Sequence, residues 1–115
     1  MDAEEFARMW RTHADGSLEE MFTPESQRYF GEHLPLSSLS AEQSECIKRL
    51  IRLVVLEDHF NFLMALDGAA SVSGQGEDGT TKLWHDHYQV LTSKGDSIYV
   101  RGELAAAAIR WFPDL

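Results

Sequence analysis

The stretch SAEQSECIKRLIRLVVLEDHFNFLMALDG, residues 40–68, holds the longest apolar run of the chain. It opens with Ser40 and Gln43, the spacing at which two side chains cap the first backbone N–H groups of a helix. It closes on Gly68, and glycine adopts the left-handed turn that follows a helix at little cost. The stretch therefore predicts one helix of roughly seven or eight turns, around which the rest of the chain is organised.

The apolar residues change sides along this helix, at about 100° per residue. The first half carries its apolar face on Ile47, Leu50, Ile51, Val54 and Val55. The second half carries it on Leu56, Phe60, Leu63 and Met64. A switch of this kind indicates that different layers cover the two ends of the helix. Residues 53–56 are apolar all round, so we expect them to be the most buried segment.

Two carboxylates, Glu57 and Asp58, follow directly after that apolar segment. An unpaired buried charge is costly, so each carboxylate must face solvent or have a partner. One interpretation is a structural network with Arg101 or Arg110. The other is an exposed acidic slot that takes a basic group from a ligand or partner. A catalytic pair is disfavoured, because adjacent residues diverge around a helix.

Two shorter helices are expected before the long one. Asp2 can cap the first of them, and Gly16 is expected to end it. Thr23 and Pro24 then fit a helix start, because proline suits the first helical position. Residues 24–32 are therefore expected to form the second helix.

A strand pattern replaces the helical one after residue 68. A short strand is expected at residues 71–73, and residues 82–91 alternate and are rich in aromatic side chains, which is typical of a strand. Turn residues lead from it to a returning strand, which predicts a hairpin at about 82–101. Residues 103–112 form a closing helix, whose alanines predict close packing against a neighbour.

Length and composition favour one small intracellular domain. The 115 residues are expected to form a single domain, residues 1–115, of the α+β class. The lone Cys46 rules out an intramolecular disulfide and is expected to be buried as a small apolar residue. The acidic N-terminus does not resemble a signal peptide, and the apolar run is too interrupted by charge to span a membrane, so we expect a cytoplasmic location.

The net charge of −9 is concentrated in the first part of the chain. Residues 1–47 hold ten acidic and three basic residues, a net of −7. Such a field repels phosphate and anionic lipid, so neither nucleic acid nor membrane is an expected partner. It attracts a basic protein surface and speeds the encounter with it.

The triplet His85-Asp86-His87 places two imidazoles on one face of the expected strand. Two histidines at this spacing can chelate a metal, but a zinc site needs further ligands. No spacing in the sequence singles out those ligands, so no metal and no cofactor are expected. The alternative role of the pair is a histidine-lined face for a protein partner.

The end of the long helix, FNFLMALDG at residues 60–68, resembles the corresponding helix of small acidic bacterial immunity proteins of toxin–immunity systems. A short hairpin and a terminal helix often follow in those proteins, as in residues 82–112. The resemblance implies a cytosolic inhibitor that covers a cognate toxin with an acidic surface. It implies no catalytic residue.

We therefore expect a non-enzymatic protein-binding module, most simply an immunity or antitoxin-type inhibitor of a toxin domain with a basic surface. The candidate partner-binding residues are Glu19, Glu20, Glu57, Asp58, Glu77, Asp78, His85 and His87. One alternative is a small metal- or ligand-binding α+β enzyme that uses His85, His87 and Glu57 or Asp58. A second is an acidic secretion or assembly chaperone. A homodimer is compatible with each of these.

Overall fold

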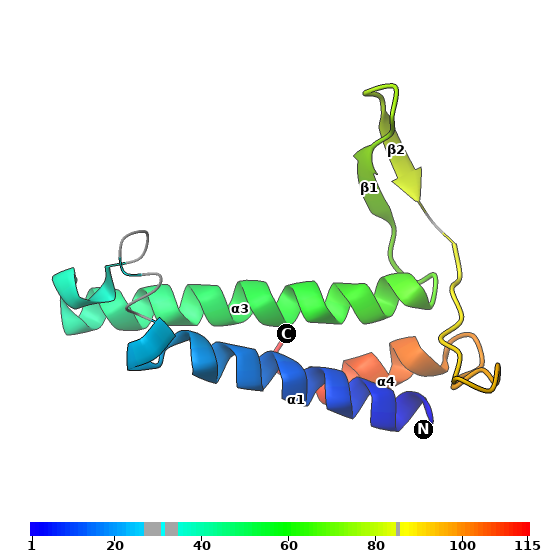
Figure 1. Ribbon diagram of the computed structural model, residues 1–115, viewed down its shortest axis with the longest axis horizontal. Helices are drawn as coiled ribbons and strands as arrows, with labels where there is room; N and C mark the ends of the chain where they lie inside the picture. Colours follow the sequence, from blue (N-terminus) through cyan, green and yellow to red (C-terminus); the bar gives the residue numbers. More distant parts are fainter. Residues whose placement is uncertain (27–30, 32–34, 85) are drawn as a thin grey trace.

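The computed structural model spans residues 1–115 and describes all of them except 27–30, 32–34 and 85. The elements in chain order are α1 (Ala3–Met21), η1 (Leu36–Ser38), α3 (Ala41–Leu66), β1 (Val72–Gln75), β2 (Thr81–Trp84) and α4 (Glu103–Trp111). Figure 1 shows α1 and α4 along one side of α3, while the β1–β2 hairpin rises from the end of α3 toward the other side. The protein is thus α+β with a long central helix, as the sequence predicts.

Both ends of α3 follow their local signals. The hydroxyl of Ser40 accepts the N–H of Gln43 at 3.1 Å, and the Gln43 side chain accepts the N–H of Ser40 at 3.0 Å. At the other end Gly68 has φ +70°, and the N–H of Ala69 donates to the carbonyl of Met64 at 2.8 Å. This is a Schellman motif with glycine in the left-handed position, so the capping prediction is confirmed at both ends.

The prediction that Gly16 ends the first helix is wrong, because α1 continues through it to Met21. Glycine costs about 1 kcal/mol inside a helix relative to alanine. Burial of Ala14 and Leu18 on either side outweighs that cost. In the predicted second helix, residues 24–26 are helical and Gly31 lies in a turn, while the other residues fall outside the described part of the chain.

The predicted hairpin at about 82–101 is wrong for residues 82–84, which belong to β2 and pair elsewhere, and within the described residues only its turn between Leu91 and Ser97 is present. β2 pairs with β1, the strand that precedes it in the chain. The two strands are antiparallel, and Val72 lies opposite Trp84. The short strand expected just after the long helix is therefore present as β1, and it is the strand that pairs with β2. In the described part of the later segment, the pairing is limited to one bridge between Leu91 and Ser97. The loops at residues 76–80 and 92–96 have equal lengths, so loop-closure entropy does not select the partner of β2.

The buried core lies around the C-terminal half of α3. Leu56 and Leu63 are fully buried there, and Leu104 of α4 is buried with them. Small residues let the three helices approach closely, namely Ala3, Ala7, Ala14, Ala107 and Ala108. The alanine run of α4 therefore packs against neighbours as predicted.

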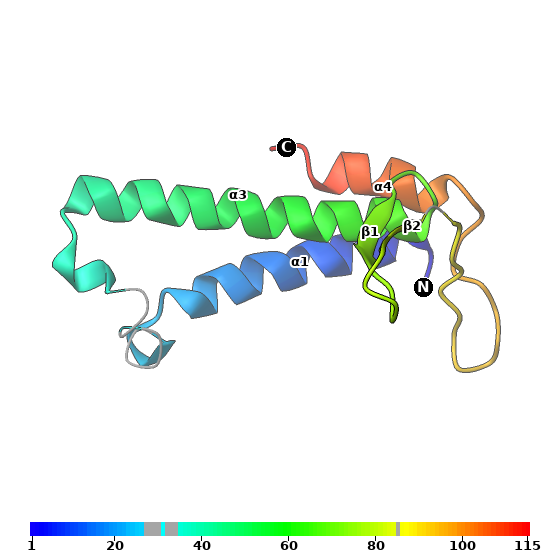
Figure 2. The same ribbon diagram turned by 90° about the horizontal axis from the view of Figure 1, so that it is seen from above.

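The N-terminal half of α3 is largely uncovered. Leu53 is 49% exposed and Val54 is 57% exposed, so the prediction that residues 53–56 are the most buried segment is wrong for these two, while Val55 is half-buried against the core and Leu56 is fully buried. Cys46 is exposed as well, contrary to expectation. The physical reason is that neither α4 nor the hairpin extends along this half of α3. In Figure 2 α4 and α1 flank α3, but α4 lies beside its C-terminal half, from whose end the hairpin rises (Figure 1).

The result is an L-shaped molecule in which α3 is the long arm and the β1–β2 hairpin is the short arm (Figure 1). Its principal extents are 48 × 38 × 26 Å. Within the described residues, no helix combines the length and the apolar character needed to cross a bilayer.

Candidate functional site

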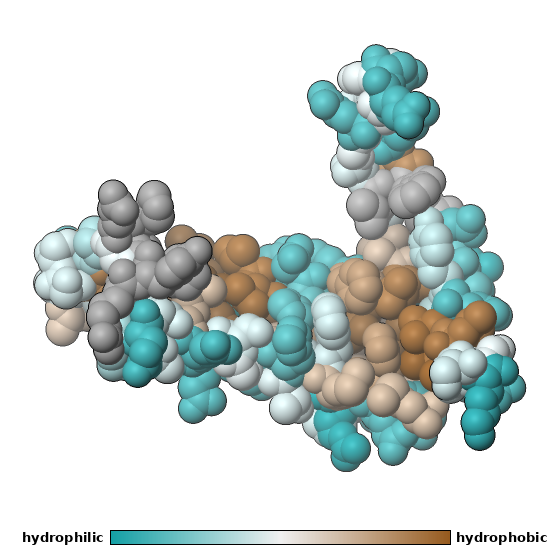
Figure 3. Space-filling view, in the orientation of Figure 1, coloured by the Kyte–Doolittle hydropathy of each residue, from teal (hydrophilic) through white to brown (hydrophobic). Residues whose placement is uncertain are grey.

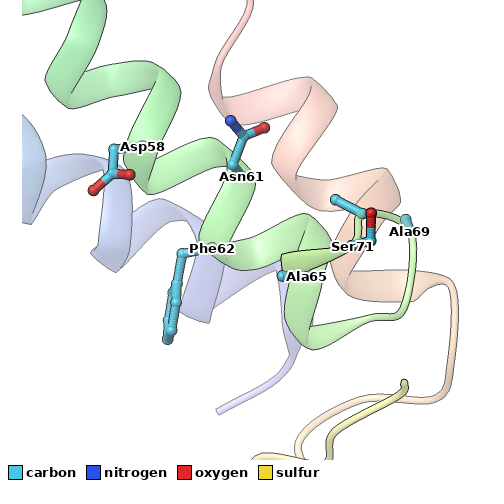
Figure 4. Close-up of a pocket in the computed structure, with 7 residues that line it drawn as sticks. Asp58, Asn61, Phe62, Ala65, Ala69 and Ser71 are labelled. Carbon is cyan, nitrogen blue, oxygen red and sulfur yellow. The ribbon is translucent and has the colours of Figure 1, made fainter. Parts of the chain in front are cut away.

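A hollow of about 670 Å³ lies at the inner angle of the L, where α3 meets the chain entering β1. We call it the corner hollow, and Figure 4 shows its lining. Its residues are Asp58, Asn61, Phe62, Ala65, Ala69, Ala70 and Ser71. It is open to solvent and combines one carboxylate, one amide, one hydroxyl and one aromatic ring.

The carboxylates of Glu57 and Asp58 are exposed. Within the described residues neither of them has an ion-pair partner. Arg110, one of the two partners considered from sequence, instead binds Glu4, with Nε 3.0 Å from the carboxylate. The second, Arg101, is exposed. The buried-network interpretation is therefore wrong, because both carboxylates face solvent; their role in taking a basic group stays a prediction.

An aromatic cluster of Trp10, His13, His59 and Phe62 borders the corner hollow. The Trp10 ring lies 5.0 Å from the His59 ring and 5.1 Å from the Phe62 ring. Its Nε1 donates to the carbonyl of His59 at 3.2 Å, which ties α1 to α3. Phe62 stays 44% exposed. The sequence carried a signal for this cluster, since each pair is spaced i, i+3 on its own helix, but not for the contact between the helices.

The tip of the hairpin is the second acidic position. Glu77 and Asp78 are both exposed there, and Figure 3 shows a hydrophilic surface over this end of the hairpin. Asp78 accepts hydrogen bonds from the hydroxyl of Thr80 at 2.7 Å and from its N–H at 3.1 Å. These bonds hold the pKa of Asp78 below its ordinary value.

The remaining acidic candidates lie elsewhere. Glu19 and Glu20 are exposed near the C-terminal end of α1, which is the end remote from the hairpin (Figure 1). The fold thus brings Asp58 to the corner hollow, leaves Glu57 exposed on α3 outside its lining, and places Glu77 and Asp78 at the hairpin tip. The α1 pair lies apart from all of these.

His87 packs against residues of its own chain, whereas a histidine-lined face for a partner needs it exposed. Its side chain is 19% exposed, and its Nδ1 lies 3.5 Å from a carboxylate oxygen of the buried Asp67. Its ring meets the Tyr99 ring edge-on at 5.9 Å. His85 falls outside the described residues, so the expected pairing of the two histidines stays a prediction. In the described part of the chain, no group of three or more His, Cys, Asp or Glu residues is placed to hold a metal.

Comparison with protein-family models, with curated proteins and with solved structures finds no match for the chain. The features that bear on the function are the acidic inner angle, its aromatic border and the acidic hairpin tip.

Proposed function

We propose that this protein is a non-enzymatic binding module of the immunity or antitoxin type, which neutralises a cognate toxin domain in the bacterial cytoplasm. The observation that carries the proposal is the acidic inner angle of the L. Asp58 lies at the corner, and Glu77 and Asp78 lie at the end of the short arm. A convex basic surface seated in this angle meets carboxylates from both arms.

The chemistry of the corner hollow suits recognition of a basic side chain. The Asp58 carboxylate is free to accept charge-assisted hydrogen bonds from arginine or lysine, the strongest hydrogen bonds between side chains. The half-exposed Phe62 beside it offers an aromatic face to the same guanidinium group. The Asn61 amide and the Ser71 hydroxyl add neutral donors and acceptors that fix orientation.

The charge of the whole chain supports the same function. Opposite potentials on two proteins raise the rate at which they meet and exclude partners of the wrong sign. With a net charge of −9, the protein favours a basic partner over nucleic acid or membrane. The proposal assigns no catalytic residue and no cofactor.

The test begins with the full-length protein as bait in extracts of its native host, followed by purification of the captured domain. We expect a toxin domain that binds with defined stoichiometry and loses its toxic activity in the complex. The variant Asp58→Asn/Glu77→Gln/Asp78→Asn should bind at least about 10-fold more weakly, because three charged contacts are neutralised. Glu19→Gln/Glu20→Gln is the matched control and should retain nearly full affinity.

Two results would contradict the proposal. If the triple variant bound and inhibited as well as the natural protein, the inner angle would not be the binding surface. If the captured partner were an unfolded export segment rather than a folded toxin domain, the protein would be a chaperone. Circular dichroism of each variant separates loss of binding from loss of folding.

A further inference from the structure

The outward side of α3 carries the spacing of a coiled-coil seam. Residues recur there at alternating intervals of four and three, and they are Gln43, Ile47, Leu50, Val54, Glu57 and Asn61. The centre of the seam is apolar and its ends are polar. Leu50 is 62% exposed and Val54 is 57% exposed, so the centre of the seam faces solvent.

The molecule exposes more surface than a single compact chain of its size. Its accessible surface is 8114 Å², against about 6,300 Å² for a compact monomer of 13.0 kDa, an excess of roughly 1,800 Å². Its radius of gyration is 17.4 Å, against about 13 Å for a compact domain of this length. A stable protein interface covers about 800 Å² on each partner. The excess belongs to the whole L-shaped molecule, and it is large enough to include one side of a dimer.

We propose that two copies of this chain associate through the seam of α3, with the helices antiparallel and Leu50 on the two-fold axis. The seam fits a second copy of this chain, because polar residues lie at equal distances on either side of its apolar centre. Gln43 and Glu57 each lie seven residues from Leu50, so an antiparallel pair places the Gln43 side chain of one copy opposite Glu57 of the other.

The polar residues of the seam select the antiparallel direction. A parallel pair would set Glu57 of one copy against Glu57 of the other, and like charges repel. In the antiparallel pair Glu57 meets an amide instead. The Gln43 carbonyl oxygen already accepts the N–H of Ser40 at 3.0 Å, which leaves the side-chain NH₂ free to donate to that carboxylate.

The paired stretch has a defined length. Ala41, the first residue of α3, lies nine residues before Leu50 and therefore meets residue 59 of the other copy. The hairpin and its acidic tip lie beyond this stretch on both copies. Asn61 belongs to both the seam and the corner hollow, so a second copy and a basic partner compete for this part of α3. Self-association is measured on the protein alone, so its test is separate from that of the proposed toxin partner.

Sedimentation equilibrium of the full-length protein tests the proposal. We expect a dimer at micromolar concentration, and Leu50→Lys should raise the dissociation constant on the order of 100-fold, because it places two ammonium groups at the two-fold axis. Ile109→Lys is the matched control, since Ile109 is 61% exposed on α4, and it should remain dimeric. Mixing Leu50→Lys with Leu50→Glu should restore a heterodimer. A natural protein that is monomeric at 100 µM, the top of the concentration series, would overturn the proposal.

Disulfide cross-linking under oxidising conditions tests the relative direction of the two helices. It also tests the interface if the Leu50→Lys variant fails to fold. In the antiparallel pair the two Cys46 residues lie about 12 Å apart along the helix axis, too far for a disulfide. Leu50→Cys in a Cys46→Ser background should instead cross-link at the axis. Rapid disulfide formation through Cys46 in the natural protein would contradict the antiparallel arrangement. Failure of the Leu50→Cys variant to cross-link would show that residue 50 does not lie at the interface.

Discussion

The carboxylate of Asp67, just past the end of α3, accepts the backbone N–H of Gly102 at 2.8 Å. A second N–H, that of Ala105, donates to the same carboxylate at 2.8 Å. Gly102 has no side chain to cap α4, and its φ of +96° places it in the left-handed region that glycine favours. The buried Asp67 therefore supplies from a distant part of the chain the cap that α4 lacks.

Replacing Asp67 should weaken the fold more than an exposed substitution does. Asp67→Ala leaves the N–H groups of Gly102 and Ala105 without their acceptor, so we expect the free energy of unfolding to fall by about 2–3 kcal/mol. Asp67→Asn keeps one acceptor oxygen and should lose less. Urea denaturation measures both, with the exposed Asp96→Ala as control. Equal stability of all three variants would show that the cap contributes nothing.

Two glycines should respond in opposite directions to the same substitution. Gly68→Ala forces a side chain into φ +70° and brings a Cβ 3.2 Å from the carbonyl of Asp86, so we expect a loss of about 1–2 kcal/mol. Gly16→Ala meets no atom within 4 Å in the middle of α1 and should raise stability by about 0.5–1 kcal/mol. Thermal unfolding followed by circular dichroism compares them. A destabilised Gly16→Ala would mean that α1 is not continuous in solution.

The contact between Asp114 and α1 should make part of the stability depend on acid pH. Two hydrogen bonds from Arg11, at 2.7 and 3.1 Å, lower the pKa of Asp114 to about 2. Because the folded pKa lies below the unfolded value of about 3.9, the carboxylate stabilises the fold above pH 4, and this contribution disappears between about pH 4 and pH 2. Asp114 is 39% exposed, so Asp114→Asn should cost less than about 1 kcal/mol at neutral pH.

The measurement for Asp114 is the stability difference between the natural protein and Asp114→Asn across this pH range. The difference should shrink toward zero as the pH falls from 4 to 2. Asp96→Asn, an exposed acid in a turn, should show a small difference that does not vary in the same way. A difference for Asp114→Asn that stayed constant down to pH 2 would rule out the contact with Arg11 as its cause.

Association with a basic partner should slow as salt is added. Exposed charges are screened beyond about 8 Å at physiological ionic strength, so we expect the on-rate to drop roughly 10-fold from low to physiological salt. Glu19→Gln/Glu20→Gln should lower the salt dependence of the on-rate while leaving the off-rate unchanged. Stopped-flow kinetics with the captured partner separates the two rates. An on-rate that is flat with ionic strength would mean that the acidic residues serve solubility alone.

Local signals predicted the features that depend on neighbouring residues. The ends of α3 follow from Ser40, Gln43 and Gly68, whose hydrogen bonds reach only a few residues along the chain. The presence of two neighbouring carboxylates on α3 was predictable for the same reason, because Glu57 and Asp58 are adjacent in the sequence. Whether those carboxylates were buried or exposed was not, since that depends on where Arg110 is placed by α4.

Features that depend on distant residues could not be predicted. Periodicity identifies Leu53 and Val54 as apolar but does not say whether another layer covers them. The alternation in residues 82–91 indicates a strand but does not choose between two candidate partners. The contact of Asp67 with Gly102 spans 35 residues, and an Asp beside a helix-ending Gly has the ordinary appearance of a turn.

Because other elements cover α3 unevenly, the free energy of local unfolding differs between the two halves of this one helix. Its C-terminal half is held by Leu56, Leu63 and the Asp67 cap, whereas its described N-terminal half buries no side chain fully. Segments with few buried contacts open locally at much lower free energy than the core. The amides near Cys46 therefore exchange with solvent through fraying, and those near Leu63 exchange only when the whole domain unfolds. Self-association through Leu50 would remove this difference, so the hydrogen-exchange gradient along α3 reports how much of the protein is paired.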